Sequence, residues 1–141
     1  MAAYDKMGYW RCTKTFSSDS RAIGPYLDEV TAALENRGWN PQDVFAVRLA
    51  LDEAVANAIE HGNRRDPTKK IQATAEITQN RALISIQDDG GGFAQDAVND
   101  PTLDENIEQP HGRGLFLIKN FMTRVWHNEK GNVIYMEKSP Q

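Results

Sequence analysis

Residues 40 to 62, NPQDVFAVRLALDEAVANAIEHG, have the strongest helical pattern in the sequence. Asn40 is a good N-cap, and Pro41 suits the first helical position. Gly62 is expected to end the helix in the left-handed conformation that glycine tolerates. Apolar side chains recur between these caps at steps of three and four, which predicts one long buried face: Val44, Val47, Leu51, Val55 and Ala58. Whatever fold the chain adopts must bury that face.

Two polar residues lie beside this buried face. Glu53 and Asn57 are four positions apart, so their side chains lie one helical turn above each other. A carboxylate and a carboxamide at the edge of an apolar face are costly unless something pairs with them. Their oxygens suit a divalent cation that also binds a phosphate. The simpler interpretation is a half-exposed pair on the shoulder of an ordinary helix.

Length and composition limit the classes of protein to which this chain can belong. The 141 residues are expected to form one domain with its own core. A net charge of -4 argues against general binding of nucleic acid. Cys12 is the only cysteine, which excludes a disulfide within the chain and suits a reducing cytoplasm. No apolar run approaches ~20 residues and no signal-peptide core is present, so we expect neither insertion into a membrane nor export.

The remaining periodicities predict a sheet and two further helices. We expect strands over 9–16, 71–77, 82–88, 123–127 and 133–138, and helices over 17–38 and 111–122. The first strand is expected at a sheet edge. The second and third strands should each turn alternate residues to one side and form an antiparallel hairpin, and the last two strands should form another hairpin. Pro25 means that the first helix either begins there or is kinked. These elements predict an α/β (α+β) two-layer sandwich, with helices on one face of a mixed, mostly antiparallel sheet of about four or five strands.

Two glycine-rich stretches have a physical use in holding a nucleotide. Gly90 and Gly92 lack the Cβ atoms that would keep a flat base from the backbone, and Asp88 can accept from an exocyclic amine such as that of adenine. Gly112 and Gly114 open a predicted helix, whose unpaired N–H groups and dipole form an anion site. The acidic segment 94–110 between them is long for a loop, as lids or disordered segments are. Taken alone, each glycine stretch is more often an ordinary turn.

In this order, however, three motifs resemble the GHKL ATP-binding superfamily. EAVAN, DDGGGF and GRGLFLI match its N, G1 and G2 boxes. Within it, the helix and the compact length look like the anti-sigma-factor serine kinases of bacteria. Histidine kinases share the boxes but would need a phosphoacceptor helix, which we do not find in this sequence. The resemblance covers residues 10 to 138 and implies the Bergerat ATP-binding fold, a single kinase domain over 1–141, and an ATP lid at 94–110.

The resemblance also implies roles for individual residues. Glu53 corresponds to the catalytic carboxylate, the general base for a serine hydroxyl of a protein substrate. Asn57 corresponds to the ligand of Mg2+ at the phosphates of ATP, and Asp88 to the aspartate that reads adenine. The other nucleotide-binding positions that it implies are Gly90, Gly92, Gly112, Arg113, Gly114 and Leu115. The phosphate contact of Arg113 is inferred from its charge, because the family varies at this position.

One departure from the family lies in the last hairpin. The family often has a threonine after the glycine, where its hydroxyl supports the adenine, whereas this chain reads Gly131, Asn132 and Val133. Asn132 can offer a replacement hydrogen bond and Val133 cannot. Loss of one neutral hydrogen bond weakens binding by about 0.5–1.5 kcal/mol, so nucleotide binding should survive.

The family further implies partners. The leading hypothesis is a homodimeric, ATP-dependent serine protein kinase and anti-sigma factor that sequesters a sigma factor and phosphorylates a small antagonist protein. Arg21, Asp28 and Glu29 are candidate partner contacts by position only. Neither nucleic acid nor a membrane is expected as a direct partner. Two alternatives stay open: a non-catalytic ATP-binding module that switches a partner surface, and an α/β binding domain without a nucleotide.

Overall fold

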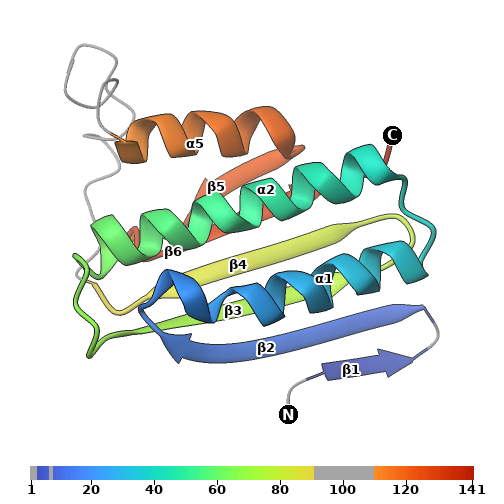
Figure 1. The fold of residues 1–141 in the computed structure, drawn as a ribbon. Helices are drawn as coiled ribbons and strands as arrows, with labels where there is room; N and C mark the ends of the chain where they lie inside the picture. Colours follow the sequence, from blue (N-terminus) through green and yellow to red (C-terminus); the bar gives the residue numbers. More distant parts are fainter. Residues whose placement is uncertain (1–2, 7, 91–109) are drawn as a thin grey trace.

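The computed structural model of the chain describes residues 3–6, 8–90 and 110–141. Its elements in chain order are β1 (Ala3–Lys6), β2 (Tyr9–Ser17), the 3-10 helix η1 (Ser20–Ala22), α1 (Gly24–Asn36), α2 (Pro41–Asn57), the π-helix η2 (Ala58–Gly62), β3 (Lys70–Ile77), β4 (Ala82–Asp88), α5 (Pro110–Phe121), β5 (Arg124–His127) and β6 (Val133–Lys138). Figure 1 shows α1, α2 and α5 on one face of a six-stranded sheet. The predicted two-layer architecture is confirmed.

The strand order is β1-β2-β3-β4-β6-β5. Every described pairing is antiparallel, whereas we predicted a mixed, mostly antiparallel sheet. The expected hairpins β3–β4 and β5–β6 are both present. The prediction that β2 lies at an edge is wrong, because β1 pairs with its outer side. Four residues are too few for an alternating pattern to predict β1, and this strand brings the sheet beyond the four or five that we expected.

The core lies between the sheet and the helices. Alternate residues of β3 and β4 point toward the helices and are fully buried, as predicted: Ile71, Ala73, Ala75, Ile77, Ala82, Ile84 and Ile86. Val47, Leu51 and Val55 of α2 cover them and are equally buried. Burial of one such aliphatic side chain contributes about 1.5–3 kcal/mol. The long face of α2 therefore holds this helix against the centre of the sheet.

The helix ends explain where α1 and α2 begin. The Asn40 side chain accepts a hydrogen bond from the Asp43 backbone N–H at 2.9 Å, so the predicted N-cap of α2 is confirmed. Helix α1 begins at Gly24, so Pro25 lies in its first turn and causes no kink. None of the described helices has the length and apolar character needed to cross a membrane.

The end of α2 differs from our prediction. Gly62 does not adopt the left-handed conformation; the helix continues as η2, and the Asn63 N–H donates to the carbonyl of Ala58 at 2.8 Å. The positive φ angles follow later, at Arg64 (51°) and Arg65 (59°). A π-helical turn adds one residue to the turn and often occurs at functional sites. Gly62 is therefore present for a reason other than a cap.

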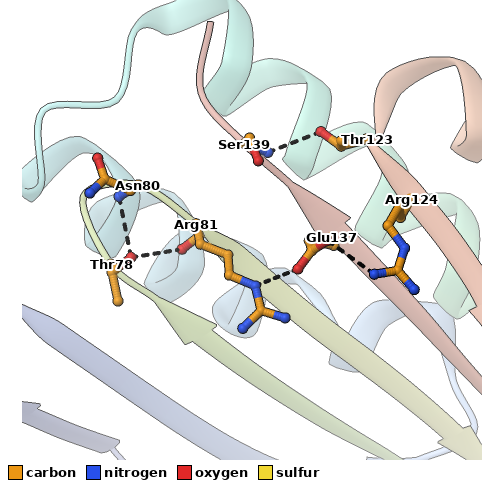
Figure 2. A network of polar contacts seen from close by, with 7 residues as sticks. All are labelled: Thr78, Asn80, Arg81, Thr123, Arg124, Glu137 and Ser139. Carbon is orange, nitrogen blue, oxygen red and sulfur yellow. Dashed lines mark hydrogen bonds and ion pairs between the residues drawn. The ribbon is translucent and has the colours of Figure 1, made fainter.

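A polar network ties the C-terminal hairpin to the rest of the sheet (Figure 2). Glu137 on β6 accepts a hydrogen bond from Arg81, beside the β3–β4 turn, and its other oxygen lies 3.8 Å from Arg124 on β5. The Ser139 N–H donates to the Thr123 hydroxyl at 3.0 Å. These contacts fix the register of β4, β6 and β5 at the end of the sheet opposite Asp88.

Candidate nucleotide site

Helix α2 presents the two polar residues that the sequence singled out. Glu53 and Asn57 are both partly exposed, while the neighbouring Ala54 and Val55 are buried. Within the part of the chain that the structure describes, neither polar side chain makes a hydrogen bond or an ion pair. The predicted position on the shoulder of the helix is confirmed, and both groups are available to a ligand.

Asp88 ends β4 and is only 8% exposed. Its Oδ1 accepts a hydrogen bond from the Gly90 N–H at 2.8 Å, and its own N–H donates to the Asn132 carbonyl at 3.0 Å. Burial raises the pKa of the Asp88 carboxyl above its ordinary value, and the Gly90 N–H and the charges of Lys69 and Lys130 lower it only in part. A buried carboxylate with spare acceptor capacity suits a ligand that brings a hydrogen-bond donor.

Gly62 and Gly90 allow the Asp88 carboxylate to lie against the end of η2. A Cβ on Gly62 would be 2.1 Å from Oδ2 of Asp88, and a Cβ on Gly90 would be 1.8 Å from the Gly62 carbonyl oxygen. No side chain fits at either position without displacement of its neighbours. Sequence reasoning identified Gly90 but missed Gly62, because a glycine at the end of a helix is usually interpreted as a cap.

The position where the family often has threonine also lies beside Asp88. Asn132 contacts Asp88 through its backbone carbonyl, and its side-chain Oδ1 accepts from Asn128 at 2.8 Å. Its Nδ2 lies 3.5 Å from the Asp88 carbonyl oxygen. The Asn132 amide is thus held next to the candidate base-reading residue, whereas Val133 begins β6. A contact between Asn132 and a nucleotide stays a prediction.

Helix α5 brings the third motif to the same end of the molecule. It packs antiparallel to α2, so its N-terminus lies beside the end of α2 where Asn57 is found (Figure 1). Gly112, Arg113 and Gly114 lie in its first two turns, where backbone N–H groups near the start lack partners within the helix. Leu115 is buried in the core. Gly92 and the predicted lid, apart from Pro110, lie outside the described residues.

The sequence was compared with known protein families and with characterised proteins. The family model of the histidine kinase-like ATPase domain matches residues 16–138. An anti-sigma F factor of Oceanobacillus iheyensis is 31% identical over 121 residues, which cover 82% of this chain and 73% of that protein. A serine-protein kinase RsbW of Staphylococcus aureus is 29% identical over 117 residues, which cover 77% of this chain and 74% of that protein. The domain match includes α2, Asp88 and α5.

Proposed function

Because the chain belongs to the histidine kinase-like ATPase domain family, we propose that it is an ATP-dependent serine protein kinase that also acts as an anti-sigma factor. One observation supports the nucleotide site most strongly. The buried Asp88 carboxylate lies against two glycines where any Cβ would displace a neighbouring group, at the end of the molecule where α2 ends and α5 begins. Residues 1–141 would act as a single kinase domain.

Asp88 reads the base in this proposal. Its carboxylate accepts a hydrogen bond from the exocyclic amine of adenine. Gly90 keeps this carboxylate in place, because a Cβ there would be 1.8 Å from the Gly62 carbonyl oxygen. Guanine has a carbonyl oxygen where adenine has the amine, and this oxygen would face the carboxylate without a proton between them. The site therefore favours ATP over GTP.

Asn57 and the start of α5 would hold the phosphates. Asn57 offers its amide oxygen to Mg2+, which needs only one or two protein ligands because phosphates and water supply the rest. The positive end of the α5 dipole and the Arg113 charge favour the triphosphate.

Glu53 is the proposed general base. It lies one turn before Asn57 on the same helix, and no described residue occupies its carboxylate. It takes the proton of a substrate serine while the serine oxygen bonds to the γ-phosphorus and the bond from phosphorus to the ADP oxygen breaks. When bound at Asn57, Mg2+ would neutralise charge on the phosphates.

The partners follow from the relatives rather than from contacts in the structure. We propose a sigma factor and a small antagonist protein as partners, which the names of the relatives support. A homodimer as the working form and the cytoplasm as the compartment are proposed from the family resemblance alone. Cys12 is free and buried, as expected for a reducing environment. The position-based candidates Arg21, Asp28 and Glu29 all form ion pairs within the chain, with Asp19, Arg48 and Lys14.

Calorimetric titration with ATP and Mg2+ tests the nucleotide site. The wild-type protein is expected to bind ATP, and Asp88→Asn is expected to weaken binding at least about tenfold, because the amide presents a donor to the adenine amine. The free energy of unfolding should not fall in this variant, because an ionised Asp88 is unfavourably buried. Equal ATP affinity in both proteins would contradict the assigned role.

ATP affinity is also expected to fall in acid. The raised pKa means that the Asp88 carboxyl binds a proton at pH values where an ordinary aspartate is ionised. The proton removes the negative charge and so weakens the bond that the adenine amine donates, and affinity should fall below the raised pKa by up to about tenfold per pH unit. Titrations at several pH values would measure the slope. Asp88→Asn serves as the control, and a slope that persists in this variant would assign the effect to another group.

A further inference from the structure

Asn63 directly follows η2 and is completely buried, at 0% exposure. Sequence analysis assigned it no role. A buried carboxamide requires partners for both ends, because an unpaired polar group in the interior is destabilising. Its partners therefore show which segments the residue connects.

The Asn63 amide connects three segments of the chain, two of which are distant from it in sequence. Its Nδ2 donates to the Ser18 hydroxyl at 3.2 Å and to the Lys70 carbonyl at 3.0 Å. Its Oδ1 accepts from the backbone N–H of Asp89 at 2.8 Å. All the polar atoms of this side chain are thus used, and one bond reaches the residue next to Asp88.

The Asp89 bond limits where the Asp88 carboxylate can lie. The Asp88 backbone is held on one side by the Asn132 carbonyl and on the other by the Asn63 bond to Asp89. A second contact holds the same turn, because the Lys70 N–H donates to the Asp89 side chain at 2.8 Å. Of these three contacts, only the Asn63 bond comes from the residue that directly follows η2, the helical extension of α2.

We propose that Asn63 is a positioning residue for nucleotide recognition. It fixes the turn after β4 relative to α2, so that the Asp88 carboxylate meets the adenine amine while the phosphates reach Asn57. This inference rests on the proposed ATP site. It assigns the preference for adenine to Asn63 as well as to Asp88, although Asn63 does not touch the base.

The test compares ATP with purine riboside triphosphate, which differs from ATP only in lacking the exocyclic amine. Calorimetry would measure both affinities for the wild type and for Asn63→Ala. The wild type should bind ATP about tenfold more tightly than the analogue. In Asn63→Ala this ratio should fall toward one, because ATP binding weakens and analogue binding does not. If Asn63 had a merely structural role, the affinities for both nucleotides would fall by the same factor and their ratio would not change.

Ser18→Ala is the matched control. It removes one partner of the same buried amide but leaves the bond to Asp89, so it should lower stability and keep the wild-type ratio. If Asn63→Ala does not fold in water, both affinities are measured in trimethylamine N-oxide, which favours the folded state.

Two results would overturn the proposal. They are a folded Asn63→Ala protein with the wild-type ratio, and a Ser18→Ala protein whose ratio falls as far as that of Asn63→Ala. A wild-type protein that binds neither nucleotide would instead reject the ATP site itself, and with it this role of Asn63.

Discussion

Replacement of Glu53 by glutamine is expected to slow phosphate transfer to a protein serine by about 10²–10⁴-fold, the usual contribution of a general base. ATP affinity should stay the same, because Glu53 contacts neither Asp88 nor its supporting turn in the described structure. Folding should also be unaffected, since the side chain is partly exposed and breaks no described hydrogen bond. The rate would be measured as transfer of labelled phosphate from ATP to a purified antagonist protein.

Asp52→Asn provides the matched control for this prediction. Asp52 precedes Glu53 on α2 and is exposed, so the variant removes the same charge from the same turn without touching the proposed site. Its transfer rate should equal that of the wild type. A Glu53→Gln protein that transfers phosphate as fast as the wild type would show that the base is another group. A wild type that exchanges partners with nucleotide but transfers no phosphate would favour the non-catalytic module.

Replacement of Asp43 by alanine is expected to lower the free energy of unfolding by about 3–5 kcal/mol, as removal of one partner of a buried ion pair does. Asp43 is 3% exposed and accepts hydrogen bonds from Asn40 and from the Gln141 N–H, at 2.7 and 2.9 Å. Lys138, also buried, lies 3.8 Å from it. Without Asp43, the Lys138 ammonium would keep only the Phe121 carbonyl as a described partner. Urea unfolding would measure the change.

Asp28→Ala is the corresponding surface control. Its ion pair with Arg48 is largely exposed, with side-chain exposures of 74% and 41%, so its removal should change stability far less. If the two variants lose the same free energy, the buried contacts of Asp43 stabilise the fold no more than an exposed ion pair does. Asp43 lies in the first turn of α2 and Asn57 at its end, so a folded Asp43→Ala protein should still bind ATP.

Local patterns predicted most of the fold. The Asn40 cap and the apolar steps of α2 are properties of neighbouring residues, and so is the alternation that forms β3 and β4. The strand β1 escaped prediction because its pairing with β2, not its own short sequence, makes it a strand. The antiparallel direction of every described pairing likewise depends on how the chain returns between strands, which periodicity does not encode.

The residues of the candidate site also fall into two groups, those that local sequence predicted and those that only tertiary contacts explain. The spacing of Glu53 and Asn57 on a helix, and the place of Asp88 at the end of a strand, followed from the sequence by itself because each involves only local geometry. Only the tertiary structure decided what Gly62 and Asn63 do. Gly62 is needed because the Asp88 carboxylate packs against it, and the buried Asn63 amide accepts a hydrogen bond from the Asp89 N–H, 26 positions away. Such constraints arise where segments distant in sequence pack together. The partner segment determines how much space is available and which donors and acceptors must be paired, and these two conditions limit which side chain fits.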